Sequence, residues 1–200
     1  MTKTTTRAKP KTAAKTKAKA KPKAKAKPTA KPPKHQSAAA KGLLDVGQAV
    51  PAFSLPTGSG DKVSLQELKG KGAVVLYFYP KADTSGCTKE ACAFQKDLAK
   101  FSKLGAMVIG VSPDGPAALK KFGDKYGITF PLAGDDGAAL AKKFGVWVEK
   151  NMYGRRYMGI QRATFLIDKA GRVAAVWPKV KVDGHSAAVL SELAALSTKT

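Results

Sequence analysis

The sequence predicts an α/β domain in which a mixed central sheet is flanked by helices and preceded by a basic tail. The run 73–79, AVVLYFY, is apolar, β-branched and aromatic, which is typical of a buried strand. Apolar residues then recur every three to four positions over 87–103, which predicts a helix with one buried face. Residues 1–41 are lysine-rich and of low complexity, so the composition divides the chain into residues 1–41 and 42–200.

The basic tail carries most of the charge of the chain. Residues 1–41 contain 13 Lys, one Arg and no acidic residue, which supplies +14 of the net +22. Residues 42–200 carry 22 Lys and Arg against 14 Asp and Glu, or +8. Repeated KAKAKP, frequent proline and the lack of large apolar side chains predict a disordered segment. A cluster of lysines without acidic residues predicts non-specific binding to nucleic acid. The alternative is a solvated tail that binds no nucleic acid.

The other elements of the domain follow from periodicity and turn residues. Strands are expected at 52–55, 63–65, 106–111, 163–167 and 173–177, and helices at 116–126, 137–144 and 186–196. Residues 68–72 are expected to form a polar turn. Early strands that alternate with helices pair in parallel, whereas the final hairpin adds antiparallel strands. This order of elements predicts a thioredoxin-like fold.

The two cysteines and the lack of apolar spans restrict the class of protein. A chain of 200 residues with two cysteines folds on its apolar core, so its cysteines are more often catalytic than structural. No apolar run approaches the roughly 20 residues that span a bilayer, and no secretory signal precedes the domain. We therefore expect a cytoplasmic protein without a membrane partner. The spacing of two His and two Cys does not fit zinc, so no metal or other cofactor is expected.

Cys87 stands at the centre of the functional hypothesis. It follows the buried run 73–79 and a short loop, and it opens the helix predicted over 87–103. The first turn of a helix has unpaired N–H groups and the positive end of the helix dipole, which stabilise a thiolate. A thiolate is the nucleophilic form of cysteine. The sequence thus predicts a reactive cysteine in a strand–loop–helix unit.

Two motifs in the sequence resemble those of peroxiredoxins. Pro80-x-x-x-Thr84-x-x-Cys87 matches the active-site pattern of that family, and the wider string YFYPKADTSGCTKEAC resembles its bacterioferritin-comigratory-protein (Q-type) branch. The segment 157–168, YMGIQRATFLID, resembles the arginine-bearing strand of the same branch. The resemblance covers residues 43–200 and leaves the tail outside it.

The resemblance implies a role for each residue of the site. Cys87 is expected to attack the peroxide and become a sulfenic acid. The hydroxyl of Thr84 is expected to bond the thiolate and the peroxide, and Arg162 to stabilise both by its charge. Pro80 would shape the loop and shield the site from water, and Glu90 is a secondary residue of the same network. The structural alternatives are Thr84 as a helix cap alone, Pro80 as a strand stop and Arg162 as a surface charge.

Cys92 is the candidate resolving cysteine. Five residues along a helix separate two Cα atoms by about 8–9 Å. A disulfide needs about 4.4–6.8 Å, so Cys87 and Cys92 cannot join while the helix is intact. We therefore expect residues 87–92 to unwind after oxidation. The alternative is a mechanism with one cysteine, in which Cys92 is only a buried helix residue.

These observations favour a thiol-dependent peroxidase that reduces hydrogen peroxide and organic hydroperoxides. Its Cys87–Cys92 disulfide would be reduced by thioredoxin or a similar dithiol protein, and the resemblance implies a monomer. The tail would tether the enzyme to nucleic acid and so associate it with the nucleoid. One alternative is a nucleic-acid-coating protein with a secondary redox domain. Another is a thiol–disulfide oxidoreductase, which the four-residue gap between the cysteines disfavours.

Overall fold

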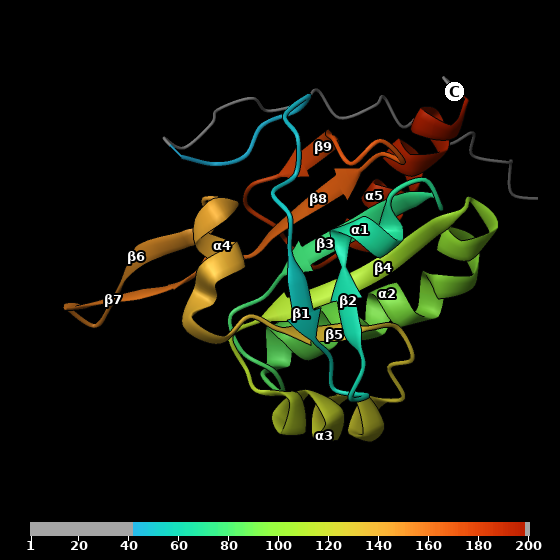
Figure 1. Ribbon diagram of the computed structural model, residues 1–200. Coiled ribbons are helices and arrows are strands. Elements are labelled where there is room, and N and C mark those ends of the chain that lie inside the picture. The colour runs from blue at the N-terminus through green and yellow to red at the C-terminus, as the bar shows by residue number, and fades with distance from the viewer. Residues whose placement is uncertain (1–41, 199–200) are drawn as a thin grey trace, which may run out of the picture. The chain divides into compact units, whose positions relative to one another are not determined.

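The computed structural model describes residues 42–198, so the tail predicted for residues 1–41 lies outside it. Its centre is a five-stranded sheet in the order β5-β4-β3-β8-β9 (Figure 1). The strands of this sheet are β3 (Ala73–Phe78), β4 (Ala106–Ser112), β5 (Leu132–Gly134), β8 (Ala163–Ile167) and β9 (Val173–Trp177). The strand β3 is parallel to β4 and antiparallel to β8. The expected mixed sheet and thioredoxin-like layout are confirmed.

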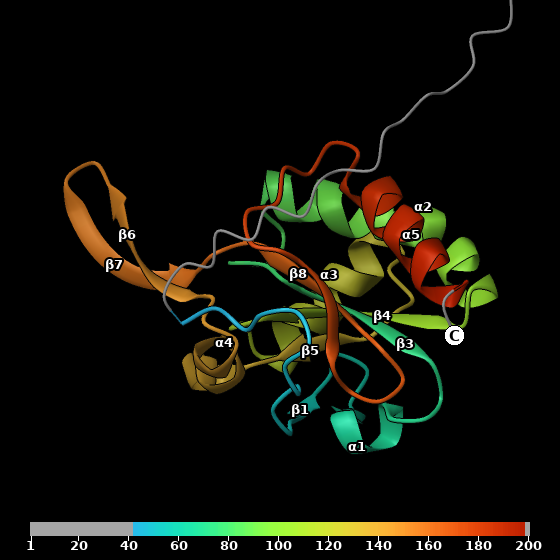
Figure 2. The ribbon, with the colours of Figure 1, turned by 90° about the horizontal axis from the view of Figure 1, so that it is seen from above.

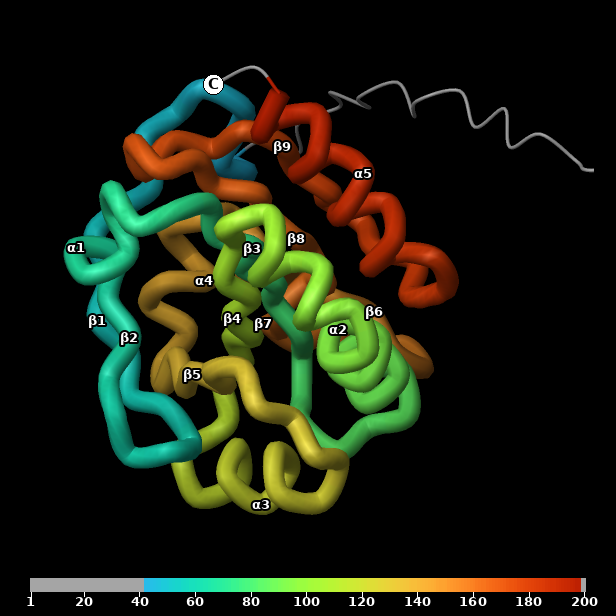
Figure 3. Tube along the Cα trace, turned by 90° about the vertical axis from the view of Figure 1, so that its right-hand side faces the viewer, coloured from blue at the N-terminus to red at the C-terminus, as the bar shows by residue number. Residues whose placement is uncertain are grey.

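Alternation along β3 divides the core into two halves. Val74, Leu76 and Phe78 point to one face of the sheet, where α1 (Leu65–Leu68) and α4 (Ala139–Lys143) pack. Val75 and Tyr77 point to the other face, which is covered by α2 (Ser85–Lys103), α3 (Pro116–Tyr126) and α5 (His185–Ser197). Figure 3 shows α2 and α5 together on one side of the sheet, with α1 and α4 on the other. Both faces are covered, which explains why β3 is a continuous apolar run.

Most predicted boundaries agree with the structure to within a few residues. The early hairpin is β1 (Ser54–Pro56) with β2 (Lys62–Ser64), and 137–144 is a 3₁₀ turn, Asp136–Ala138, followed by α4. The predicted turn at 68–72 is confirmed over residues 69–71, but the prediction missed α1, which includes Leu65 of the predicted strand 63–65 and Leu68 of the predicted turn. The N-cap of α1, Ser64, accepts a hydrogen bond from the Glu67 N–H. Within residues 42–198, no helix has both the length and the apolar character needed to cross a membrane.

The hairpin of β6 (Trp147–Met152) and β7 (Arg155–Ile160) is absent from the sequence prediction. Its residues do not alternate clearly between apolar and polar, because neither strand has a buried face: three of six residues in β6 and four of six in β7 are exposed. The hairpin forms a two-stranded sheet of its own, and Figures 1 and 2 show it projecting from the body of the domain. Its turn residues, Tyr153 and Gly154, both have positive φ, as in a type I′ turn.

Candidate active site

Cys87, the predicted reactive cysteine, lies just after the loop that joins β3 to α2. The strand β3 ends at Phe78, and α2 begins at Ser85 with Thr84 as its N-cap. Cys87 is therefore in the first turn of α2, and only 1% of its surface is exposed. Unpaired N–H groups and the helix dipole favour a negative sulfur at this position. Burial restricts the access of large molecules to the same atom.

Strand pairing brings Arg162 to this helix from a distant part of the sequence. The antiparallel register of β3 and β8 places Ala163 opposite Phe78, so Arg162 lies just beyond the end of β3. Its Nη2 donates to Cys87 Sγ at 3.1 Å, and its Nη1 donates to Glu90 Oε2. The guanidinium therefore bridges the sulfur and a carboxylate. Only the fold makes this contact, because the two residues are 75 positions apart.

Gly86 is the neighbour that makes room for the guanidinium. A Cβ atom at residue 86 would lie 3.3 Å from Arg162 Nη2. That separation is tighter than ordinary van der Waals contact, so a side chain here would press on the group that holds the sulfur. Gly86 is not among the site residues predicted from the sequence.

Burial and neighbouring charges shift the pKa values of Glu90 and Arg162 in opposite directions. Burial raises the pKa of Glu90 to about 7, although the charge and the hydrogen bond of Arg162 lower it. Burial lowers the pKa of Arg162, but the charges of Glu90 and Cys87 outweigh that effect and raise it. The guanidinium thus stays charged beside the sulfur. Glu90 can change its protonation near neutral pH.

Aromatic side chains close the inner wall of the site, which the sequence analysis did not foresee. Tyr77 is fully buried and stacks on Phe94 of α2 at 4.8 Å between ring centroids. Burial raises the pKa of Tyr77, and the charges of Tyr79, Glu90 and Cys87 raise it further. The Tyr77 hydroxyl and Glu90 Oε1 have no hydrogen-bond partner among the described residues. The site therefore has a low-polarity wall, within which charge interactions are strong.

Two acidic residues anchor the loop that precedes Cys87. Asp114 Oδ2 accepts the Ala82 N–H at 2.7 Å. Asp83 has a φ of +58° and accepts from Lys125 Nζ at 2.8 Å and from the Tyr126 hydroxyl at 2.6 Å. Asp tolerates the left-handed region better than most residues, which is the only signal the sequence carried for this anchor. We call Asp83, Lys125 and Tyr126 the loop clamp.

Thr84 and Pro80 are near the site, but Thr84 does not contact the sulfur. The Thr84 hydroxyl donates to the Lys81 carbonyl at 3.1 Å, and it makes no side-chain capping bond to α2. The Lys81 carbonyl is a local acceptor, so the hydroxyl is already engaged before a peroxide arrives. Pro80 is half-buried at the start of the loop. Their catalytic roles stay predictions.

Cys92 lies on the same helix and is not bonded to Cys87. Both cysteines are free thiols, and Cys92 is half-buried whereas Cys87 is buried. Residues 85–103 form one continuous helix. The five-residue spacing then separates the two Cα atoms by about 8–9 Å, which is too far for a disulfide.

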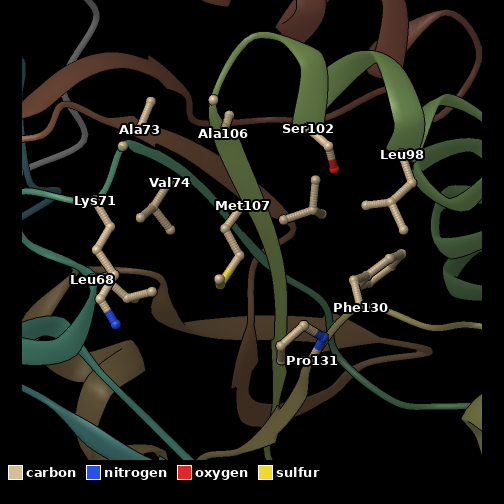
Figure 4. A pocket seen from close by; sticks show the side chains of 13 residues that line it. Leu68, Lys71, Ala73, Val74, Leu98, Ser102, Ala106, Met107, Phe130 and Pro131 are labelled. Carbon is tan, nitrogen blue, oxygen red and sulfur yellow. The ribbon is translucent and has the colours of Figure 1, made fainter.

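A groove of about 410 Å³ lies away from the reactive cysteine. It is lined at the starting ends of β3 and β4, and Figure 4 shows Leu68, Met107 and Phe130 around it. Cys87 follows the opposite end of β3. The lining has no thiol, imidazole or guanidinium that could act on a peroxide. The candidate active site is therefore the surroundings of Cys87 and not this groove.

The family is decided by comparison with known proteins. Residues 46–176 match the model of the AhpC/TSA family. The chain belongs to the AhpC/TSA family. Its relatives include a putative peroxiredoxin bcp of Coxiella burnetii, 51% identical over 75% of this chain and 99% of that protein. The peroxiredoxin Bcp of Bacillus subtilis is 46% identical over 78% of this chain and 99% of its own length.

Solved structures agree with these relatives. The bacterioferritin comigratory protein of Xanthomonas campestris, described for its alkyl peroxide reduction activity, has a TM-score of 0.72 to this structure. It is 41% identical and covers 76% of this chain and 99% of its own. The chain is a peroxiredoxin of the bacterioferritin-comigratory-protein (Q-type) branch and a thiol-dependent peroxidase. The expected family and enzyme class are confirmed.

Proposed function

We propose that Cys87 is the peroxidatic cysteine and that Arg162 is its main electrostatic partner. The observation that carries this proposal is the 3.1 Å bond from Arg162 Nη2 to Cys87 Sγ at the start of α2. The Cys87 thiolate attacks the terminal oxygen of the hydroperoxide, forms an S–O bond and breaks the O–O bond. The leaving alkoxide takes a proton and departs as an alcohol, or as water when the substrate is hydrogen peroxide. Arg162 stabilises the negative charge that moves from sulfur to oxygen.

The substrate class follows from the exposure of the site and from its relatives. Cys87 is 1% exposed, so it is reached by a small hydroperoxide group and not by a bulky one. Tyr77 and Phe94 are buried in the same apolar cluster as Cys87, so the inner side of the site is apolar. The Xanthomonas campestris relative is described as reducing alkyl peroxides. We infer that this chain reduces hydrogen peroxide and small organic hydroperoxides.

Cys92 completes the catalytic cycle in this proposal. Its thiolate attacks the Cys87 sulfenic sulfur, the S–O bond breaks, and hydroxide leaves as water after protonation. The first two turns of α2 must unwind for this step, because the intact helix keeps the cysteines apart. A dithiol protein of the thioredoxin type then reduces the disulfide.

The test is peroxide consumption with a thioredoxin system in wild type, Cys87→Ser and Cys92→Ser. We expect no turnover above background for Cys87→Ser. Cys92→Ser is expected to consume one equivalent and stop as a sulfenic acid, which a dimedone adduct would detect. Sustained turnover by Cys92→Ser would contradict the two-cysteine cycle. Amide exchange of residues 85–95 is expected to rise in the oxidised protein, and unchanged protection would contradict the unwinding step.

We further propose that residues 1–41 bind nucleic acid without sequence preference. The support is their composition, which places +14 on 41 residues with no acid and no aromatic side chain. Lysines that neutralise phosphates release counterions, so the affinity should fall steeply between about 50 and 200 mM salt. Deletion of residues 1–41 should remove most of this salt dependence and leave peroxide turnover intact. Equal DNA affinity in the shortened chain would contradict the proposal. A nucleoid association would follow from this binding.

A further inference from the structure

The tip of the β6–β7 hairpin exposes side chains that proteins usually cover. Tyr153 is 100% exposed, and Met152, Tyr157 and Met158 are exposed by 44–56%. They are four of the six large hydrophobic residues exposed among residues 42–198. Figures 1 and 2 show that the hairpin stands out from the domain. Exposed aromatic and methionine side chains gathered in one place mark a contact surface.

Tyr153 also adopts a backbone conformation that does not suit it. Its φ is +52°, in the left-handed region, where a bulky side chain is rarely found. Asn or Gly is the usual residue at this position of a type I′ turn. A tyrosine here costs stability, and because its side chain is fully exposed, packing within residues 42–198 does not offset that cost. Strain at an exposed position indicates a role for the side chain outside the fold.

The register of the hairpin sorts its charges onto two faces. Lys150 pairs with Tyr157, and Met152 pairs with Arg155, so these four residues share one face. The opposite face holds Glu149, whose carboxylate lies 3.3 Å from Arg156 Nη1. The only acid of the hairpin is therefore neutralised on that opposite face. The face with Tyr157 has no carboxylate; its two cations are Lys150, whose ammonium donates to the Ile160 carbonyl, and Arg155.

We propose that the hairpin tip, formed by Met152, Tyr153, Arg155 and Tyr157, is a contact surface for single-stranded nucleic acid. Phosphates would pair with Arg155, and bases would stack on the tyrosine rings. The positive charge favours an anionic partner. Residues 42–200 carry +8, and this face of the hairpin has no acidic side chain. This inference extends the proposal for residues 1–41, which have no aromatic side chain and so supply charge without stacking. The two contacts can fail separately.

The test measures binding of a short fluorescein-labelled oligothymidine to the full chain. Tyr153→Asn removes the ring and relaxes the turn, so it should not impair folding. We expect its Kd for oligothymidine to rise about tenfold, the loss of one stacking contact. Its Kd for heparin, a polyanion without bases, should match that of wild type. The thermal midpoint of the variant checks that the fold is intact.

A matched pair of arginine variants tests which face of the hairpin binds the oligonucleotide. Arg155→Gln is expected to weaken oligothymidine binding and to lower the slope of log K against log salt by about one. Arg156→Gln removes the same charge from the neighbouring position on the opposite face. It should change the affinity by less than about twofold, because that charge is already paired with Glu149. Equal effects of the two variants would overturn the assignment of the face.

Several outcomes would overturn the proposal. Wild-type affinity for oligothymidine in Tyr153→Asn would do so, and so would the absence of binding by the wild-type chain. A raised KM for the dithiol reductant with unchanged oligothymidine affinity would identify a protein-docking surface instead. The deletion of residues 1–41 separates the two contacts. The relatives consist almost entirely of the matched region, so the remaining domain folds alone. If the hairpin binds without help from residues 1–41, Tyr153→Asn should still weaken oligothymidine binding in the chain that lacks them.

Discussion

Two glutamate–arginine pairs, one in the site and one in the hairpin, have the same chemistry and opposite surroundings. Arg162 and Glu90 have side chains exposed by 17% and 1%, whereas Arg156 and Glu149 are exposed by 76% and 56%. Burial raises the pKa of Glu90 to about 7. Water screens the exposed pair, which contributes little to stability. The comparison teaches that burial, more than residue type, distinguishes the arginine beside Cys87 from an arginine at the surface.

The same two regions also differ in how they hold a residue with positive φ. Asp83, at +58°, is fixed by Lys125 and Tyr126 of α3. Tyr153, at +52°, is fully exposed. Contacts within the domain hold Asp83 in place, whereas the side chain of Tyr153 is directed to solvent. The positive φ of Asp83 is therefore held by the domain itself, whereas that of Tyr153 is consistent with the proposed outward-facing contact.

The largest effect is expected from removing the buried arginine. Arg162→Met should lower the rate of peroxide reduction by about 10²–10³-fold, because a preorganised donor at the developing negative charge is lost. Arg155→Met in the exposed hairpin is the matched control and should change that rate by less than about twofold. Single-turnover loss of the free Cys87 thiol measures both. Similar rates for Arg162→Met and wild type would contradict the role of Arg162.

A second prediction concerns the pH dependence given by Glu90. The pKa of Glu90 is raised from 4.5 to about 7 in the folded protein, so folding binds its proton more tightly. Its contribution to the free energy of unfolding is complete below pH 4.5 and is lost as pH rises to about 7. Relative to Glu90→Gln, the free energy of unfolding of wild type should therefore fall by on the order of 3 kcal/mol as pH rises through this range. Urea unfolding at several pH values measures the difference.

The exposed glutamate supplies the control for that experiment. Glu149→Gln lies in the hairpin, where the side chain is 56% exposed. We expect its stability curve to run parallel to that of wild type over the same pH range. A parallel curve for Glu90→Gln as well would show that the buried carboxyl does not bind its proton more tightly on folding.

A third and smaller effect is expected from the loop clamp. Asp83→Asn keeps a residue that tolerates positive φ and removes the ion pair with Lys125. Unwinding of the start of α2 should become easier, so Cys87–Cys92 disulfide formation should accelerate by about two- to fivefold, the scale of an exposed ion pair. Stopped-flow fluorescence after a peroxide pulse measures this step.

Asp124→Asn is the matched variant for the clamp. It breaks the exposed Lys120–Asp124 pair on the same helix, α3, without touching the loop. Its rate of disulfide formation should equal that of wild type. A slower or unchanged rate in Asp83→Asn would refute the clamp as a brake on unwinding.

The smallest effect is expected at the turn of the hairpin. Tyr153→Asn relieves left-handed strain, so the thermal midpoint should rise by about 2–4 °C. Asp83→Tyr places the same strain in the clamped loop and should lower the midpoint. Differential scanning calorimetry measures both. A lower midpoint for Tyr153→Asn would show that the tyrosine ring stabilises the fold.

Much of the fold was predictable because its signals are local. The buried run of β3, the helix period of α2 and the turn before β9 each depend on neighbouring residues. The strand β5 has only three residues, and its pairing with Gly110–Ser112 of β4 makes it a strand. The hairpin β6–β7 was missed because its exposed strands do not alternate between apolar and polar. Its Tyr-Gly turn is a weak signal compared with Asn-Gly.

The sequence by itself pointed to Cys87 as the candidate reactive thiol, since a helix start and a family motif both mark this position. It also determined the charge of residues 1–41 and the spacing that keeps Cys87 from Cys92. Only the tertiary structure decided which arginine meets the sulfur, through the register of β3 with β8. It alone decided the burial that raises the pKa of Glu90, and the anchoring of the loop by Asp83 and Asp114. The physical reason is that burial and long-range contact depend on packing between elements, which no local pattern of residues encodes.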